Sequence, residues 1–310
     1  MATGYNWFQD LHGCLPICRA RFQFIQEGIT RVSLHQNKES TGKLAVLSCT
    51  HGNLPALTAV FDDLQKRGIK DSVHLGDSVG YGPDPNDTVT FLRERQIRSI
   101  QGCWDKSIAD QEEDCGCSFT SELEAIRGRE VFAWTADRVT SLTRNYLAEL
   151  PENIRIKAPC GNVLFVHGSP KSPHEYLTES IDPMILLERT HTAKCDVLVC
   201  GHTHIPFIHK VSGSVTVEKP EALSTTGRIE QMLITTKFVF NAGSVGEPLN
   251  GPEASYLIMD LKTGTGEIVY LPYDVEETIR RMRNANVPPY VIDRFRKNSD
   301  ITLKNKSCLC

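Results

Sequence analysis

Residues 44–53 read Leu-Ala-Val-Leu-Ser-Cys-Thr-His-Gly-Asn, an apolar run followed by a short polar turn. The apolar part, 44–47, predicts a short buried strand. Gly52 marks the turn, and Pro55 opens a helical pattern. In open α/β sheets, ligands bind beside the carboxyl ends of the strands. Cys49 and His51 follow the strand two residues apart, so both are positioned to reach one metal ion.

Four later strand ends carry metal-ligand residue types as well. Short strands are predicted over 72–75, 97–101, 162–166 and 196–200, and their alternation with helical patterns favours parallel pairing. The polar residues that follow these strands are Asp77, Cys103, His167 and the pair His202 and His204. Because clusters of His, Asp and Cys are typical of metal sites, we predict that these side chains share one crevice with Cys49 and His51.

The spacing of two histidines indicates a pair of metal ions. His202 and His204 are separated by one residue, so along an extended segment they lie on the same side. Each can then bind a different ion of a pair held about 3.5–4 Å apart. Asp77, with two carboxylate oxygens, is the expected bridge between the two ions.

Together these blocks resemble those of the calcineurin-like metallophosphoesterases. The similar segments, in the family's order from about Lys43 to Asp274, are Cys49–Asn53, Gly76-Asp77, Gly102–Asp105, His167-Gly168 and Gly201–His204. Gly76–Pro83 and Asn241–Gly246 are similar to the family's branch of small bacterial phosphodiesterases. The resemblance implies an α/β fold, a four-layer αββα sandwich of two mixed β-sheets flanked by helices, with 44–48 central in one sheet. It also implies a small phosphoester substrate and two divalent metal ions, with Mn, Fe, Zn and Ni as candidates.

The resemblance also assigns the ligands. One metal would bind Cys49, His51, Asp77 and His204, and the other Asp77, Cys103, His167 and His202. Cys49 stands where the family has an aspartate, and Cys103 where it has an asparagine. Trp104 occupies the position at which the family often has a histidine that acts on the leaving group. Asn53 and Asn241 are candidate substrate-contacting residues, with an ordinary turn role as the alternative for each.

The two cysteines leave three interpretations open. Thiolate is a better ligand for Zn or Fe than for Mg or Mn, so Cys49 and Cys103 are consistent with a retuned hydrolase centre. Thiolate charge also damps the Lewis acidity that polarises a phosphoryl oxygen, so the chain is alternatively a degenerate pseudoenzyme with a binding or regulatory role. The third interpretation is a thiol-based sensor in which Cys49 and Cys103 form a disulfide.

Composition limits the partners and the compartment. The chain has 310 residues, a net charge of −4 and 40% hydrophobic residues, which gives no electrostatic indication of nucleic-acid binding. No apolar run approaches the ~18 residues of a membrane span. The N-terminus lacks an apolar signal core, so we expect a cytoplasmic protein whose eleven cysteines are mostly reduced. Nothing in the sequence indicates the oligomeric state.

Three regions are expected along the chain. Residues 1–42 form an N-terminal extension and linker, 43–274 the metallophosphoesterase domain and 275–310 a helical C-terminal tail. Within the domain, Thr216–Gln231 is expected to be a surface insertion. Cys115-Gly116-Cys117 is interpreted as a turn, with a metal-binding or redox pair as the alternative. Cys308-Leu309-Cys310 resembles the end of prenylated small GTPases, but a frayed terminus is the preferred interpretation.

Overall fold

The computed structural model describes residues 42–217 and 231–306. The expected N-terminal extension up to residue 41, the centre of the expected insertion and the Cys308-Leu309-Cys310 end lie outside the described residues.

The first sheet has the order β10-β9-β1-β2-β3. Its strands are β1 (Lys43–Leu47), β2 (Asp71–His74), β3 (Arg98–Ser99), β9 (Ala254–Asp260) and β10 (Thr265–Leu271). β1 pairs in parallel with β2 and antiparallel with β9, so it is the central strand, as predicted. The carboxyl ends of β1 and β2 therefore lie at the same edge of the sheet.

The second sheet has the order β4-β5-β6-β8-β7. Its strands are β4 (Asn153–Ala158), β5 (Gly161–Val166), β6 (Val197–Cys200), β7 (Phe207–Val217) and β8 (Gln231–Asn241). The prediction of a surface insertion over Thr216–Gln231 is wrong at its two ends, where the residues belong to strands. Val217 pairs with Gln231, and the hairpin continues to the pair Phe207 and Asn241. Backbone hydrogen bonds between antiparallel strands do not require apolar side chains, which is why a polar composition concealed these strand ends.

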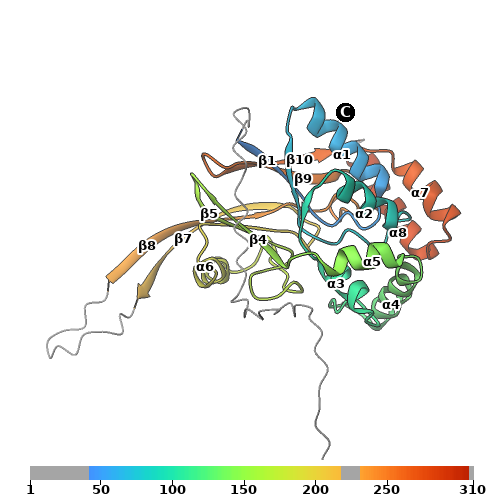
Figure 1. Cartoon of the computed structure of the whole chain (residues 1–310), viewed down its shortest axis with the longest axis horizontal. Helices are drawn as coiled ribbons and strands as arrows, with labels where there is room; N and C mark the ends of the chain where they lie inside the picture. Colours follow the sequence, from blue (N-terminus) through green and yellow to red (C-terminus); the bar gives the residue numbers. More distant parts are fainter. Residues whose placement is uncertain (1–41, 218–230, 307–310) are drawn as a thin grey trace, which may run out of the picture. The chain divides into compact units, whose positions relative to one another are not determined.

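The two sheets stack face to face and each has a helix on its outer side (Figure 1). Leu44 and Val46 point into a core shared with Val163 and Phe165 of the second sheet. The alternate residues of β1 pack instead against α1 (Leu54–Lys66). On the far side, α6 (Pro183–Thr192) packs against the outer face of β5, β6 and β8. The predicted four-layer αββα sandwich is confirmed.

The remaining helices form a cluster beside the sandwich. They are α2 (Pro85–Glu94), α3 (Cys103–Asp110), α4 (Glu122–Ala136), α5 (Ser141–Ala148), α7 (Val275–Asn284) and α8 (Pro289–Lys306). Trp104 of α3, Phe132 of α4, Ile279 of α7 and Phe295 of α8 belong to one buried cluster. The C-terminal helices thus pack against the same helices that carry part of the site.

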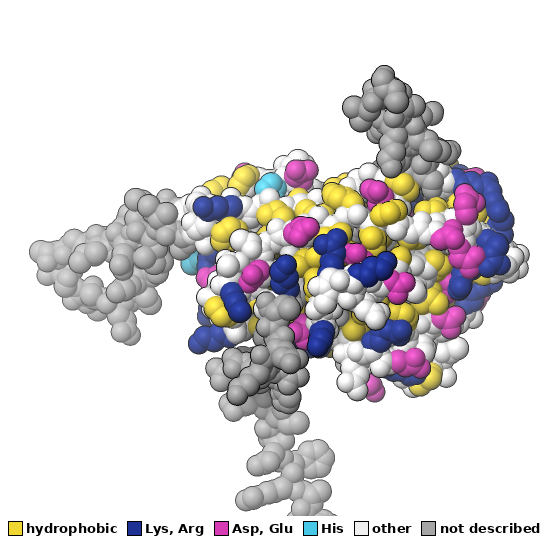
Figure 2. Space-filling model, turned by 90° about the horizontal axis from the view of Figure 1, so that it is seen from above, with side chains coloured by type: hydrophobic (Ala, Val, Ile, Leu, Met, Phe, Trp, Pro, Cys, Tyr) yellow, Lys and Arg dark blue, Asp and Glu magenta, His cyan; other side chains and the backbone are white. Residues whose placement is uncertain are grey.

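No helix in the described part of the chain is long and apolar enough to cross a membrane. On the face shown in Figure 2, Lys and Arg side chains lie among Asp and Glu side chains.

Candidate metal centre

All seven expected ligands lie at the ends of strands or at the start of a helix. Cys49 and His51 follow β1, Asp77 follows β2, His167 follows β5, His202 and His204 follow β6, and Cys103 begins α3. Left-handed backbone is uncommon for residues other than glycine and gathers at functional sites. Five of the seven have it: Cys49, His51, Asp77, His202 and His204, with φ between 48° and 65°.

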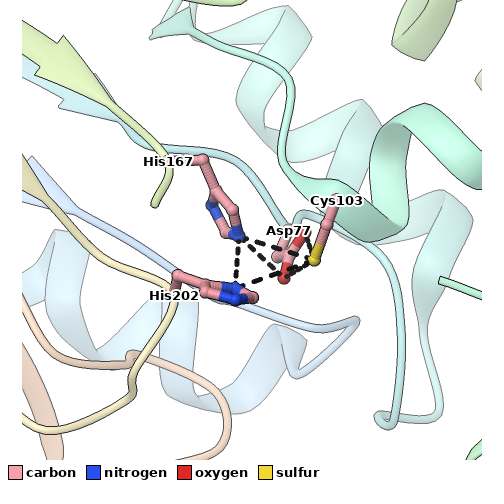
Figure 3. A group of neighbouring side chains, drawn as sticks. All are labelled: Asp77, Cys103, His167 and His202. Atoms are coloured by element: carbon pink, nitrogen blue, oxygen red, sulfur yellow. Dashed lines mark hydrogen bonds and ion pairs between the residues drawn. The ribbon is translucent and has the colours of Figure 1, made fainter. Parts of the chain in front are cut away.

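Asp77, Cys103, His167 and His202 form the first group of potential ligands, and they point toward one another in Figure 3. His167 Nε2 lies 3.2 Å from Asp77 Oδ2 and 3.1 Å from His202 Nδ1. Cys103 Sγ lies 3.5 Å from Asp77 Oδ2, 3.7 Å from His167 Nε2 and 3.8 Å from His202 Nδ1. All four residues are at most 5% exposed.

Cys49, His51 and His204 form the second group. The two histidines approach each other through their Nε2 atoms at 3.1 Å. Asp77 Oδ2 lies 3.6 Å from His51 Nε2 and 3.2 Å from His167 Nε2, so one carboxylate oxygen faces both groups. The structure therefore brings together all seven side chains singled out in the sequence and places Asp77 between the two groups.

Three of the four histidines are oriented by a backbone carbonyl. A ring N–H at Nδ1 that donates to a carbonyl turns Nε2 toward the centre, and Nε2 can bind a metal once it carries no proton. The three Nδ1···O pairs are His51 with Val79 at 3.1 Å, His167 with Leu75 at 2.7 Å and His204 with Glu247 at 2.8 Å. His202 instead faces the centre through Nδ1, and its buried Nε2 has no partner among the described residues.

Burial keeps most of these imidazoles neutral. It lowers the pKa of His51 to about 4 and that of His202 to about 3, against the attraction of Asp77. Burial would lower the pKa of His167 too, but the charge of Asp77 and its hydrogen bond raise it to about 10. For Asp77, burial would raise the pKa, but His167, with His51 and His202, holds it below its ordinary value. In the metal-free protein, the negative charge of Asp77 is thus balanced by a proton on His167. A bound cation can replace that proton.

Both site cysteines are free thiols in this structure. Burial raises the pKa of Cys49 to about 12 and also raises the pKa of Cys103. A cation has to compensate this cost before either thiol becomes a thiolate ligand. The Cys49–Cys103 disulfide of the third interpretation is not formed in this structure, and Cys103 Sγ instead lies 3.5 Å from the thiol of Cys117.

The geometry of the first group fits a tetrahedral cation. Bonds of about 2.0–2.1 Å to nitrogen and 2.3 Å to sulfur give tetrahedral edges of about 3.3 Å between nitrogens and about 3.6 Å between nitrogen and sulfur. The corresponding contacts here are 3.1 Å, and 3.7 and 3.8 Å. Imidazole and thiolate donors favour Zn or Fe over Mg. The donor set therefore fits a borderline-soft divalent cation.

Asp105 holds the backbone next to two of the ligands, a role that was not predicted from the sequence. It is fully buried, and its carboxylate accepts the N–H groups of Gly102 at 3.1 Å and Ser78 at 2.9 Å. The N–H of Trp104 donates to Asp77 Oδ1 at 2.9 Å. Gly102 has to be glycine, because a Cβ there would lie 2.2 Å from Asp77 Oδ1. The capping pattern of an acidic residue at the third helix position was the available sequence signal for Asp105.

Asn53 and Asn241 are engaged in structural contacts. Asn53 is buried, caps α1 and donates to the carbonyl of Gly246 at 2.9 Å. Asn241 is also buried and donates to Gly201 O and Thr203 Oγ1, each at 2.9 Å. These bonds favour the turn role over substrate contact for both residues, because their amide groups are occupied in holding the loops of the centre.

A large, open cavity adjoins the centre, and His51, Asp77, His202 and His204 lie in its wall. Trp104 is in the same wall but is 2% exposed, and its indole has no group that can protonate a leaving group. Helices α4 and α8 contribute the cations Arg127, Arg294 and Lys297. The guanidinium carbon of Arg294 lies 4.4 Å from the ring centre of Tyr81, and Arg294 forms an ion pair with the buried Glu247. These cations come from helices that are far apart in the sequence, so no sequence motif groups them with the metal-ligand residues.

Comparisons with known proteins agree with this geometry. A model of the calcineurin-like phosphoesterase superfamily domain matches residues 43–264. The uncharacterized protein MJ0912 of Methanocaldococcus jannaschii is 31% identical over 260 residues, which cover 81% of this chain and 96% of the relative. A metallophosphoesterase structure from Sphaerobacter thermophilus matches with a TM-score of 0.60 and 25% identity, over 82% of this chain and 98% of that one. The hypothetical protein PH1004 of Pyrococcus horikoshii OT3, at 21% identity, has the same fold with a TM-score of 0.63, over 82% of this chain and 97% of that one.

Because the family model spans most of the αββα sandwich and the archaeal relative aligns over nearly its whole length, this chain belongs to the calcineurin-like phosphoesterase superfamily.

Proposed function

We propose that the chain hydrolyses a phosphomonoester or phosphodiester at a dinuclear metal centre. The observation that carries the proposal is the position of Asp77, whose Oδ2 faces His167 of one ligand group and His51 of the other. A shared carboxylate between two donor sets is the arrangement that a two-metal hydrolase requires.

The ligand sets divide as the sequence suggests. Asp77, Cys103, His167 and His202 would hold one divalent cation, and Cys49, His51 and His204, with Asp77, the other. Bound there, the two cations would supply Lewis acidity toward a phosphoryl oxygen and an activated water. Because two thiols belong to the sets, we propose Zn or Fe ahead of Mn or Ni, and a reducing compartment such as the cytoplasm.

The residues of the cavity wall would position the substrate. Arg127, Arg294 and Lys297 supply positive charge where phosphate oxygens would approach, and a guanidinium can bind two of them at once. Burial raises the pKa of Tyr81 and of Tyr176, so both phenols remain proton donors at neutral pH. With Trp104 in place of a histidine, we expect aryl esters and diesters to react faster than alkyl monoesters, whose leaving groups need a proton.

The test is hydrolysis of nitrophenyl phosphate and bis-nitrophenyl phosphate by protein purified without chelator and supplied in turn with Zn, Fe, Mn and Ni. We expect turnover with at least one metal, and its loss in Asp77→Asn, which keeps the shape but removes the shared charge. Absence of both metal and turnover, or near-stoichiometric metal without turnover on either ester, would favour the alternative of a degenerate pseudoenzyme with a binding or regulatory role.

A further inference from the structure

A third group of potential ligands lies beside the centre and shares Cys103 with it, while Cys117 and His174 have no role in the proposed hydrolysis. Cys103, Cys117 and His174 each offer a donor atom, and these atoms lie within 4.8 Å of one another. Cys117 comes from the turn before α4, and His174 from the loop after β5. Cys117 lines the large cavity and is partly exposed, so the group can be reached from solvent.

The sulfur geometry distinguishes a metal site from a disulfide. Cys103 Sγ and Cys117 Sγ are 3.5 Å apart. A disulfide bond is about 2.03–2.05 Å long. Two thiolates on one tetrahedral zinc ion, with bonds of about 2.3 Å, lie about 3.8 Å apart. The observed separation is much closer to the second arrangement.

His174 contributes an independent observation. Its Nδ1 is buried and has no hydrogen-bond partner among the described residues. A Cβ on Gly116 would lie 3.0 Å from His174 Cε1, so the glycine between the two cysteines allows the turn to lie against the imidazole. Buried ring nitrogens are normally bonded, and a cation would satisfy this one.

We propose that Cys103, Cys117 and His174 form a third metal site, which takes a zinc-like divalent cation and shares the Cys103 thiolate with the neighbouring ligand group. Two sulfurs and one imidazole select a soft or borderline cation over Mg or Ca. Three protein ligands leave a fourth position open, the pattern of catalytic rather than structural zinc sites. Since Cys117 lies in the cavity wall, we expect water or an oxygen of the substrate to reach that position from the cavity.

The site also joins two loops, the 111–121 turn and the loop after β5, between which the described residues form no backbone hydrogen bond. A cation there would hold the 111–121 turn against the loop after β5 and so fix one wall of the cavity. Only the three ligands and the cation are needed to fix this wall, so the effect does not depend on hydrolysis.

The test compares metal content under reducing conditions in the full-length protein, Cys117→Ser, His174→Ala and Cys160→Ser. Cys160 is a partly exposed thiol outside all three ligand groups, so it is the matched control. Each protein is saturated with Zn²⁺, freed of unbound metal and analysed by mass spectrometry of the metal. We expect one zinc fewer per chain in Cys117→Ser and in His174→Ala than in the parent and in Cys160→Ser. With Co²⁺ in place of zinc, the sulfur-to-cobalt charge-transfer band should weaken in Cys117→Ser and stay unchanged in Cys160→Ser.

Equal zinc content in the parent and Cys117→Ser would overturn the third site while leaving the dinuclear centre intact. A Cys103–Cys117 disulfide in the protein as isolated would overturn it as well. Absence of zinc from the parent and from every variant would overturn the third site, whereas the dinuclear proposal would be overturned only by absence of turnover with Zn, Fe, Mn and Ni, so the two failures are distinguishable.

Discussion

The backbone at the centre is held in place by hydrogen bonds that come from the protein itself. Left-handed backbone at a non-glycine residue costs of order 1–3 kcal/mol and persists only where the surroundings enforce it. The N–H of Cys49 donates to Gly76 O at 3.0 Å, and that of His51 to Asp77 O at 2.9 Å, so the loops after β1 and β2 fix each other. The ligand positions are therefore arranged before any cation binds.

Restoring the family's ligands should change the preferred metal. We expect Cys49→Asp with Cys103→Asn to lower Zn affinity and to shift the preference toward Mn, because oxygen and amide donors are harder than thiolate. The two single changes should not add, since both ligand groups face Asp77. Competition between Zn and Mn, read by metal analysis, is the measurement. An unchanged metal preference and an unchanged rate of ester hydrolysis would exclude both cysteines from the centre.

His74 is not one of the proposed metal ligands, and its burial predicts a pH dependence of stability. Its ring contacts Thr50 Oγ1 at 2.8 Å, and burial lowers its pKa from 6.5 to about 3. A base whose pKa is lowered on folding stabilises the protein above its unfolded pKa, and this contribution is lost as the pH falls from 6.5 toward 3. Between pH 6.5 and pH 3 the His74 side chain is protonated in the unfolded state only, so the free energy of unfolding falls by about 1.4 kcal/mol per pH unit.

The check is urea denaturation of the metal-free protein and of His74→Gln at pH 7.5 and pH 5. We expect the stability difference between them to shrink by about 2 kcal/mol at the lower pH, because only the parent must keep a buried imidazole neutral. A difference that is the same at both pH values would show that His74 carries no such shift.

Among the elements, α3 links its own first residue, the ligand Cys103, to the loop after β2 that carries the ligand Asp77. Asp105 accepts the N–H groups of Gly102 and Ser78, so the start of α3 and the loop after β2 share one carboxylate. Asp105→Ala should destabilise the protein by about 2–4 kcal/mol, since buried donors left unpaired cost about 1–3 kcal/mol each. Chemical denaturation measures the loss, and zinc affinity should fall with it.

Asp110→Ala is the matched control in the same helix. Asp110 forms an exposed ion pair with Lys106, and such pairs contribute about 0–1 kcal/mol. A similar loss of stability in both variants would contradict the role given to Asp105.

The sequence predicted elements well where apolar periodicity is strong and less well where tertiary contacts override it. β1, β2, β5 and β6 were found because their apolar runs are buried between layers. α3 was read only as the exit of a strand, because Gly102-Cys103-Trp104-Asp105 lacks an apolar period and its cap is a tertiary arrangement with Asp77 and Ser78. The hairpin ends near Val217 and Gln231 were missed because their pairing depends on the backbone.

For the whole molecule, the residues that form the cavity wall could not be predicted from the sequence. The metal-ligand blocks lie at strand ends, and the alternation of strands and helices predicts parallel pairing, which places these ends at one edge of a sheet. Arg294 and Cys117 reach the cavity only through the packing of α8 and of the turn before α4, which no spacing in the chain encodes. Helix α8, expected as part of a tail, thereby contributes to the cavity wall.

Arg294 is the cation most closely linked to the centre. It pairs with Glu247, whose carbonyl orients His204. Arg294→Gln should raise KM for nitrophenyl phosphate about tenfold or more, because a charge-assisted bond to phosphate is lost. Steady-state kinetics measures it. Arg296→Gln, an exposed arginine two residues on, should leave KM unchanged, and equal effects of the two changes would exclude a specific contact.

The central claim is that Asp77 lies between two bound cations. The most direct measurement is the anomalous diffraction of crystals grown with Zn²⁺, recorded on both sides of the zinc absorption edge. We expect one peak among Asp77, Cys103, His167 and His202 and a second among Cys49, His51 and His204, about 3.5–4 Å apart with Asp77 between them. No peak at either group, or a single peak that does not contact Asp77, would contradict it.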